Sequence, residues 1–494
     1  MRRLLLPALL LLCAPAGAAA QAGSCVLVEN RFVNRQDMGG FALISVAGPL
    51  RVECAGGTTL RADSAAVYEA TNEVHLFGRV DYRDPTRTLT SANATYSSAT
   101  GRLYATGNVV FTDVTRGSTL RGPELEYYRA MEGRPQAQVI ATQRPHLTVV
   151  PTERGTGGRA NTSREPLEVD GDRITGVGEN YFSASGNVVI HRSDLDATAA
   201  EALHDGAAQT LQLRGDAKVR GERFDLSGET VDAAMPGNRL ERVVAKQNAE
   251  LVSEKLRVDG PEVQLYFQND LLQRLVSRRD PAAPTAGDRP LVTATGLRME
   301  ADSLEAILPG QKLERVVAIG RAHGETVDTT GQGGRPSDPR ARMARGERPS
   351  AATGLVRDRD WVIGDTITGF FASRDSAAAR PRAAARDTAR SPEEDVELQR
   401  VVAKGAARSL YRVQEKDKPK TATPGLNYLV AAVIDLKMKD GELDLAEAEG
   451  LQRGVYLDPD AQRPAAGQPA GTQPPAPPGQ APAQTTTPQG TRRP

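Results

Sequence analysis

Two stretches of the chain decide the fold. Val74-His-Leu-Phe-Gly78-Arg-Val80-Asp-Tyr82 is followed, 29 residues further on counted from glycine to glycine, by Leu103-Tyr-Ala-Thr-Gly107-Asn-Val109-Val-Phe111. In both stretches apolar and polar side chains alternate around a central glycine. Successive residues of a β-strand face opposite sides of a sheet, so this alternation predicts strands with one apolar and one polar face.

The same pattern recurs along the chain, as expected of a repeat fold. Further copies centre on Gly186, Gly215, Gly320 and Gly405, and a copy at 243–251 lacks the glycine. A central glycine predicts a bulge or a sharp bend in the strand. A second interpretation, compatible with the first, is that the missing side chain leaves room for a ligand.

A second kind of strand alternates with the first, and Leu60-Arg-Ala-Asp-Ser-Ala-Ala-Val-Tyr68 is its clearest example. Short turn-like segments such as 69–72 and 98–101 join the two kinds, so each unit is predicted to be a β-hairpin. Its Asp63 has counterparts in later copies, Asp302 and Asp365, which predicts a structural hydrogen bond near the strand bend. The apolar faces of the hairpins need cover from a second sheet or from a bound molecule.

The N-terminus has the features of a secretory signal peptide over 1–20. Arg2 and Arg3 are followed by an apolar run too short to span a bilayer and by an Ala18-x-Ala20 cleavage site. An exported chain would retain two cysteines, Cys25 and Cys54. An even pair in an exported protein predicts a disulfide, with two separate buried thiols as the alternative.

Composition and motifs argue against several function classes. The chain has 62 basic and 62 acidic residues and only 4% aromatic residues, so it lacks the positive charge of a nucleic-acid-binding protein. None of the common hydrolase, metalloprotease or nucleotide-binding motifs is present; Gly176-Val-Gly178 stops short of the dinucleotide motif. The five histidines lie far apart. We therefore expect neither an enzyme nor a metal site, and no cofactor.

The alternation of Leu-x-Ala-Asp-x-x-x-x-Tyr with Leu-x-Ala-x-Gly-x-Val resembles the OstA-like (organic-solvent-tolerance-like) N-terminal domain family. This is the module of lipopolysaccharide transport proteins of the LptA and LptC type and of the N-terminal part of LptD. The likeness is clearest over 50–150, continues over 167–325 and returns from Val401 to Tyr456. It implies an all-β fold, an antiparallel β-jellyroll or folded β-taco, whose apolar cleft holds acyl chains.

The predicted organisation follows from these segments. It consists of the signal peptide (1–20), OstA-like domains at 21–155 and 167–328, a disordered linker at 329–358, and C-terminal OstA-like repeats over 359–460 interrupted by a linker at 373–395. A Pro/Gln-rich tail at 461–494 ends the chain, and 280–290 is a further linker candidate. Their proline-, glycine- and alanine-rich composition offers little to bury.

The resemblance implies a periplasmic lipid carrier or bridge that moves lipopolysaccharide or a related lipid toward the outer membrane. Its edge strands would pair with LptC-like and LptD-like partners, or with further copies of the chain. The alternative is a structural or adhesive exported β-repeat protein that carries no lipid. The residues predicted to line the cleft are Leu89, Tyr96, Leu103, Val109, Phe111, Val188, Ile190, Leu211 and Val219.

Overall fold

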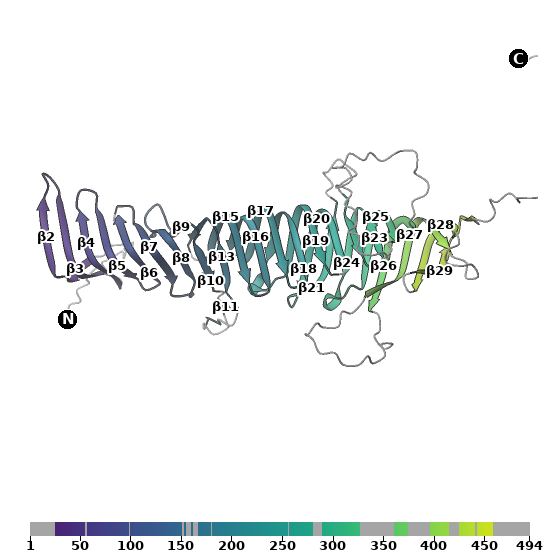
Figure 1. The fold of residues 1–494 in the computed structure, drawn as a ribbon, viewed down its shortest axis with the longest axis horizontal. Coiled ribbons are helices and arrows are strands. Elements are labelled where there is room, and N and C mark those ends of the chain that lie inside the picture. The colour runs from purple at the N-terminus through teal and green to yellow at the C-terminus, as the bar shows by residue number, and fades with distance from the viewer. Residues whose placement is uncertain are drawn as a thin grey trace, which may run out of the picture.

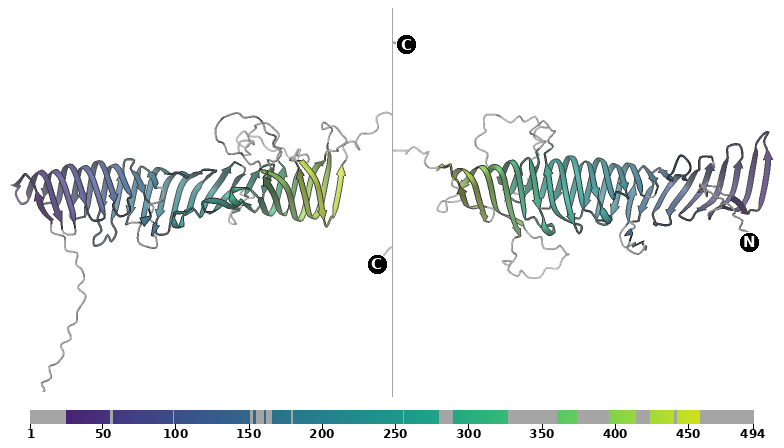
Figure 2. Two further views of the ribbon diagram at one scale, coloured as in Figure 1. Left: turned by 90° about the horizontal axis from the view of Figure 1, so that it is seen from below. Right: turned by 180° about the vertical axis from the view of Figure 1, so that it is seen from behind.

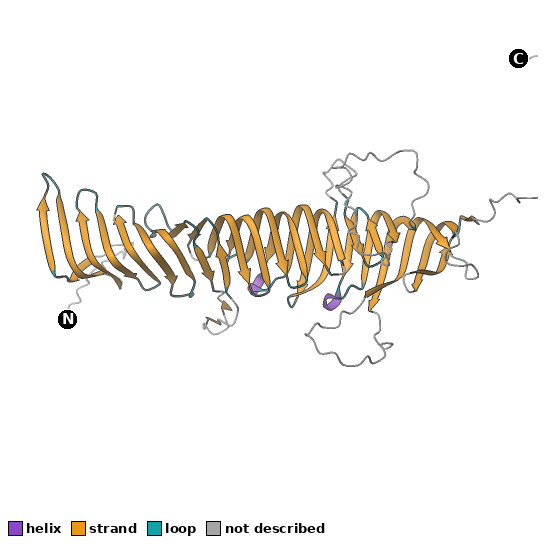
Figure 3. Cartoon of the chain, viewed as in Figure 1, coloured by secondary structure: helices purple, strands orange, loops and turns teal. Residues whose placement is uncertain are grey.

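The computed structural model describes residues 25–457, apart from 55–56, 98, 151–152, 155–159, 162–165, 179, 255, 280–288, 327–359, 374–395, 414–423 and 440–441. The described chain is almost entirely strand, and its helical elements are two short 3-10 turns, η1 (Pro236–Asn238) and η2 (Pro309–Gln311) (Figure 3). The predicted all-β, antiparallel class is confirmed. The predicted signal peptide, the linker at 329–358 and the tail lie outside the described residues.

The strands form one antiparallel sheet of 28 strands, with a separate two-stranded excursion. Their bounds are β1 Cys25–Glu29, β2 Phe32–Asp37, β3 Ala42–Cys54, β4 Thr58–Tyr68, β5 Glu73–Arg83, β6 Arg87–Ser97, β7 Arg102–Asp113, β8 Thr119–Tyr128, β9 Gln138–Thr142, β10 His146–Val149, β11 Glu153–Arg154, β12 Ala160–Asn161, β13 Leu167–Asp170, β14 Arg173–Val177, β15 Tyr181–Arg192, β16 Leu195–Asp205, β17 Thr210–Gly221, β18 Phe224–Ala234, β19 Arg242–Ser253, β20 Leu256–Gln268, β21 Leu271–Arg278, β22 Leu291–Ala294, β23 Leu297–Glu300, β24 Ser303–Ile307, β25 Arg315–Thr326, β26 Trp361–Ser373, β27 Val396–Val413, β28 Gly425–Lys439, β29 Glu442–Glu449 and β30 Arg453–Leu457.

The ladder runs without a break from one end of the sheet to the other. Consecutive long strands pair as hairpins, and some shorter strands lie end to end along one neighbour, as β9 and β10 do along β8. The segment between the two predicted OstA-like domains is crossed in this way, since β14 pairs with β9 and β13 pairs with β10. Figure 1 shows the result, an elongated body with β2 at one end and β29 at the other.

Six long strands, β5, β7, β15, β17, β25 and β27, bend near the middle at the predicted glycine. In β5 and β7 the glycine and the next residue both take positive φ, with values of 72° at Gly78, 47° at Arg79, 80° at Gly107 and 49° at Asn108. At the same points the register with the neighbouring strands shifts. Glycine adopts this left-handed backbone without a Cβ penalty, which is why it recurs at the bend. The bulge interpretation of the glycine motif is confirmed.

The second interpretation of the glycines, a space reserved for a ligand, is wrong. A Cβ built on Gly107 would lie 2.7 Å from the Cβ of Ala92 on β6, and one on Gly320 would lie 2.7 Å from Oδ2 of Asp302. The neighbouring strand therefore occupies the space. The recurring aspartate has the predicted structural role: Arg321, next to Gly320, donates from Nη2 to Oδ1 of Asp302 at 2.6 Å.

The bends fold the sheet lengthwise, so that the two ends of a strand approach one another across the interior. Figure 2 shows the strands curving around the long axis from two further sides. The apolar faces of the two halves pack together into one continuous core along the body. Hairpin turns form the two long margins of the fold. We call them the first rim and the second rim. The first rim contains 83–87, 113–119, 149–150, 192–195 and 221–224, and the second rim contains 68–73, 97, 99–102, 177–178, 180–181, 205–210 and 234–242.

Candidate functional site

The predicted cleft residues all belong to the core between the two halves of the folded sheet. Eight of the nine are at most 8% exposed, and Tyr96 is partly buried against the same core. The predicted alternation holds around them: Val109 is buried whereas Asn108 is exposed, and Leu211 and Val219 are buried whereas Lys218 is exposed. The sequence therefore located the inward face of these strands.

Much of this interior is filled by the protein's own side chains, which meet between the rims. The rings of Phe111 and Tyr127, from β7 and β8, lie 5.5 Å apart, and Arg87 at the first rim donates from Nη1 to the Tyr127 hydroxyl at 2.7 Å. Further along the body, Phe224 at the first rim and Phe267 near the second have ring centroids 5.9 Å apart. These contacts close the fold at two places.

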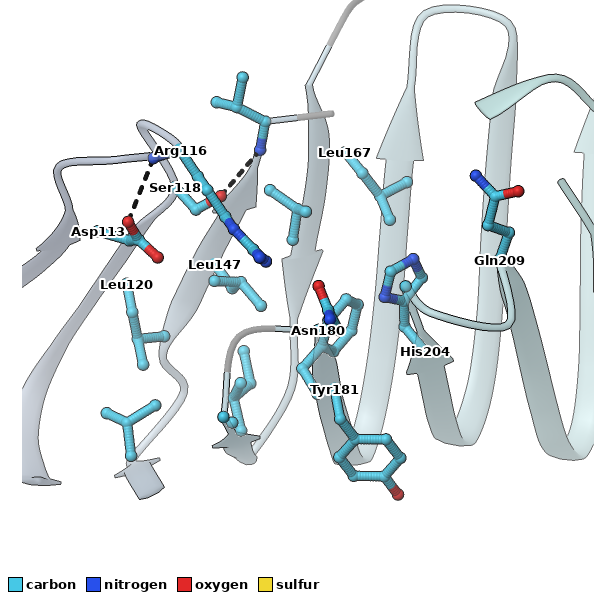
Figure 4. A pocket seen from close by; sticks show the side chains of 18 of the residues that line it. Asp113, Arg116, Ser118, Leu120, Leu147, Leu167, Asn180, Tyr181, His204 and Gln209 are labelled. Atoms are coloured by element: carbon cyan, nitrogen blue, oxygen red, sulfur yellow. Dashed lines mark hydrogen bonds between the residues drawn. The ribbon is translucent and has the colours of Figure 1, made fainter. Parts of the chain in front are cut away.

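Between these two closures lies a cavity of about 640 Å³ (Figure 4). Residues from both rims line it: Tyr181 and Arg192 are the first and last residues of β15, yet both belong to the same cavity. Only a strand that folds back can bring its two ends to one site. The volume lies within the range of small-molecule sites, roughly 300–1,000 Å³. Of the nine predicted cleft residues, Phe111 lines this cavity.

Apolar side chains form most of the cavity wall, as expected for a site that takes an apolar ligand. They come from β7 to β10, from β13 to β15, from the residue after β10 and from the segment before η1. They are Phe111, Leu120, Val139, Leu147, Val149, Val150, Leu167, Ile174, Phe182 and Met235.

Polar groups of the cavity wall lie at the rims. On the first rim these include Asp113, Arg116, Ser118 and Arg192. The Asp113 carboxylate accepts from the Thr115 amide at 2.9 Å, and Ser118 Oγ accepts from the Val150 amide at 3.1 Å, so both side chains fix the local turns. The side chain of Arg192 is 11% exposed and is held by Asp194 at 2.5 Å. Two guanidinium groups thus border an apolar space.

On the second rim, His204 is the central polar group. Its imidazole stacks on Phe182, with centroids 4.9 Å apart and planes inclined by 16°. Burial lowers the pKa of His204 below its ordinary value of 6.5. The ring is therefore neutral near pH 7 and adds no charge to the cavity. Asn180 and Gln209 complete this side, and Gln209 Oε1 accepts from the Gly237 amide at 3.2 Å.

Several glycines line the cavity at the second rim. Gly176, Gly178, Gly206 and Gly237 all line it. A Cβ on Gly237 would meet nothing within 4 Å, so this position faces open space. Sequence reasoning noted Gly176 and Gly178 only as an incomplete nucleotide motif. It missed the site because the rim residues are far apart in the chain and carry no shared spacing.

The two predicted disulfide partners lie at the N-terminal end of the fold. The ladder between β1 and β3 places Cys25 directly opposite Cys54. Opposed residues of antiparallel strands have Cα separations within the range that a disulfide spans. The pairing of the two cysteines stays a prediction.

The two ends of the sheet present apolar side chains to solvent. At the N-terminal end Phe32 and Val33 of β2 are exposed, and at the C-terminal end Val455, Tyr456 and Leu457 of β30 are exposed. In the described chain, β2 pairs only with β3 and β30 only with β28. Such edges are able to extend the sheet with another chain.

Among the described residues no three His, Cys, Asp or Glu side chains gather as a metal site would require, and no helix is long and apolar enough to cross a membrane. The sequence matches no protein-family model and no curated protein.

Proposed function

We propose that the protein is a periplasmic lipid carrier of the OstA-like kind, which holds acyl chains of lipopolysaccharide or a related lipid between the halves of its folded sheet. The observation that carries this proposal is the continuous apolar interior of a lengthwise-folded antiparallel sheet, together with the cavity that opens it between the rims. Burial of each methylene group would contribute about 0.8 kcal/mol.

The proposal includes transport along the body as well as binding, and it requires the two closures at Tyr127 and at Phe224 to open as a lipid passes. The ladder is uninterrupted over the described strands, and both ends leave edge strands with exposed apolar side chains. We propose that these edges pair with OstA-like partners, LptC-like on one side and LptD-like on the other, or with further copies of the chain. The interior of one molecule would then continue into the next.

Site-specific photocrosslinking tests the proposal. A crosslinking residue at Val109 or Phe111, on the inward face, is expected to capture lipopolysaccharide in cells, whereas one at the exposed Asn108 of the same strand is the matched control. Equal capture at the two faces would contradict the cleft. Mass spectrometry of lipids that co-purify with the unmodified protein gives a second readout, independent of any folding defect caused by the crosslinking residue.

A second candidate is a structural or adhesive exported β-repeat protein, and one observation favours it. Leu89 and Ile190 have no exposed surface, so at their positions the core is filled by the protein itself. A lipid carrier requires the two halves to separate there when the lipid enters. Absence of lipid both in the crosslinking and in the mass spectra would support the structural candidate.

A further inference from the structure

We infer that the cavity between the rims is a side-entry binding site for a single-chain amphiphile with an anionic headgroup, a free fatty acid in chemical class, with its chain inside the fold and its carboxylate at Arg116 and Arg192. The inference deepens the proposed function, because it rests on the same interior accepting an acyl chain. It adds a separate ligand and a separate route of entry.

The closures on either side of the cavity argue for a single chain. Toward the N-terminus the Arg87–Tyr127 hydrogen bond and the Phe111–Tyr127 ring contact join the two sides. Toward the C-terminus the Phe224–Phe267 contact does so. A ligand entering between the rims therefore meets a space bounded along the body, with a volume of about 640 Å³. A lipid with many acyl chains needs a longer opening.

Charge at the opening argues for an anionic headgroup. Arg116 and Arg192 line the cavity, and the carboxylate that lines it with them belongs to Asp113, which already accepts from the Thr115 and Arg116 amides of its turn. Asp194, the partner of Arg192, and Asp205, which accepts from the Ala207 and Ala208 amides, lie outside the lining. A guanidinium binds a carboxylate in a planar, two-pronged fashion. Arg192 already holds Asp194 in this way, through Nε at 2.5 Å and Nη2 at 2.9 Å, so a ligand carboxylate would bind its remaining N–H groups or replace Asp194.

Apolar lining continues inward from the arginines. Next to the first rim the cavity is lined by Leu147, Val149 and Leu167. The opposite wall is formed by Phe182 with its stacked His204. In Figure 4 the side chain of Arg116 extends over the space above Leu147 and Asn180. This order, cation at the opening and hydrocarbon within, matches the order of groups in a fatty acid.

Fluorescence titration of the purified full-length protein with dansylaminoundecanoic acid tests the inference. Wild-type protein is expected to bind this probe in competition with unlabelled fatty acid. Val149→Trp, which fills the cavity, is expected to weaken binding by at least about tenfold. Val252→Trp places the same ring on an exposed position of β19, away from the cavity, and is expected to bind as wild type.

The double variant Arg116→Gln, Arg192→Gln tests the headgroup. It is expected to lose about tenfold in affinity for the acid probe and to bind the neutral dansylaminoundecanol as wild type does. Equal binding of acid and alcohol by wild type, or unchanged binding in Val149→Trp, would overturn the inference. Lipopolysaccharide capture at Val109 without probe binding would support the carrier proposal and contradict the fatty-acid site. Probe binding without such capture would support the fatty-acid site and contradict the carrier proposal.

Discussion

At the scale of the residue, two features of the strand bend at Gly107 require glycine. Its backbone is left-handed, and the side chain of Ala92 on the neighbouring strand occupies the space that a Cβ would need. We predict that Gly107→Ala lowers the free energy of unfolding by about 2–4 kcal/mol, since it adds a positive-φ penalty and an overlap with Ala92 at 2.7 Å. Gly133→Ala is the matched control: it has φ of 83° but nothing within 4 Å of a new Cβ, so about 1 kcal/mol is expected. Urea unfolding measures both, and equal losses would contradict the steric argument.

His204 gives the fold a dependence on pH. Burial holds its pKa below 6.5, so the unfolded chain takes up this proton first as the pH falls. The stability tied to a neutral His204 is therefore present above about pH 6.5 and is lost as the pH falls below that value.

We predict that the midpoint temperature of unfolding falls less between about pH 7 and pH 5 in His204→Gln than in the wild type. The substitution also removes the ring contact with Phe182, so the slope with pH is the quantity to compare, rather than the stability at one pH. His191→Gln, at a histidine whose side chain is 60% exposed, is the control. An unchanged slope in His204→Gln would exclude this histidine as its source.

At the scale of the element, the strand bend is set by backbone conformation more than by one residue type. In β19 the bend falls at Gln247 and Asn248, with φ of 62° and 59°, in the copy that lacks the glycine. We predict that Gln247→Gly stabilises the protein by about 0.5–1 kcal/mol. Glycine avoids the penalty of about 1–2 kcal/mol that other residues have in the left-handed backbone conformation. The backbone entropy that glycine loses on folding is smaller than this penalty.

The matched control for this bend is Gln212→Gly, in a straight part of β17. There glycine removes no strain, and a loss of about 0.5–1 kcal/mol is expected. Thermal unfolding of the two variants beside the wild type measures the difference. Destabilisation of similar size in both would mean that the backbone at Gln247 is not strained.

The hairpins and their bends could be predicted from the sequence because both depend on local patterns. Alternation identified the inward face at Val109 and Val219, and the glycine located the bulge at Gly78. A bend at Gln143 and Arg144, both with positive φ, was not predicted, since no glycine marks it and Pro145 follows. The cavity also could not be predicted, because it depends on the two ends of β15 meeting across the fold.

At the scale of the whole molecule, the sheet has two edges and is otherwise continuous. Val33 on β2 is 45% exposed and Val455 on β30 is 40% exposed. Backbone groups at such edges, flanked by apolar side chains, favour pairing with another strand. We predict that the protein associates with itself end to end as its concentration rises, with β2 of one copy beside β30 of the next.

Lysine is a natural deterrent to edge pairing, so Val33→Lys combined with Val455→Lys is expected to keep the protein monomeric over concentrations at which the wild type associates. Val252→Lys introduces the same charge at an exposed position in the middle of the body and should associate as wild type does. Sedimentation velocity across a concentration series measures the association of the wild type, the double variant and Val252→Lys. A wild type that stays monomeric throughout, or a double variant that associates equally, would show that the edges do not pair with one another. Edge pairing would then have to involve a different protein.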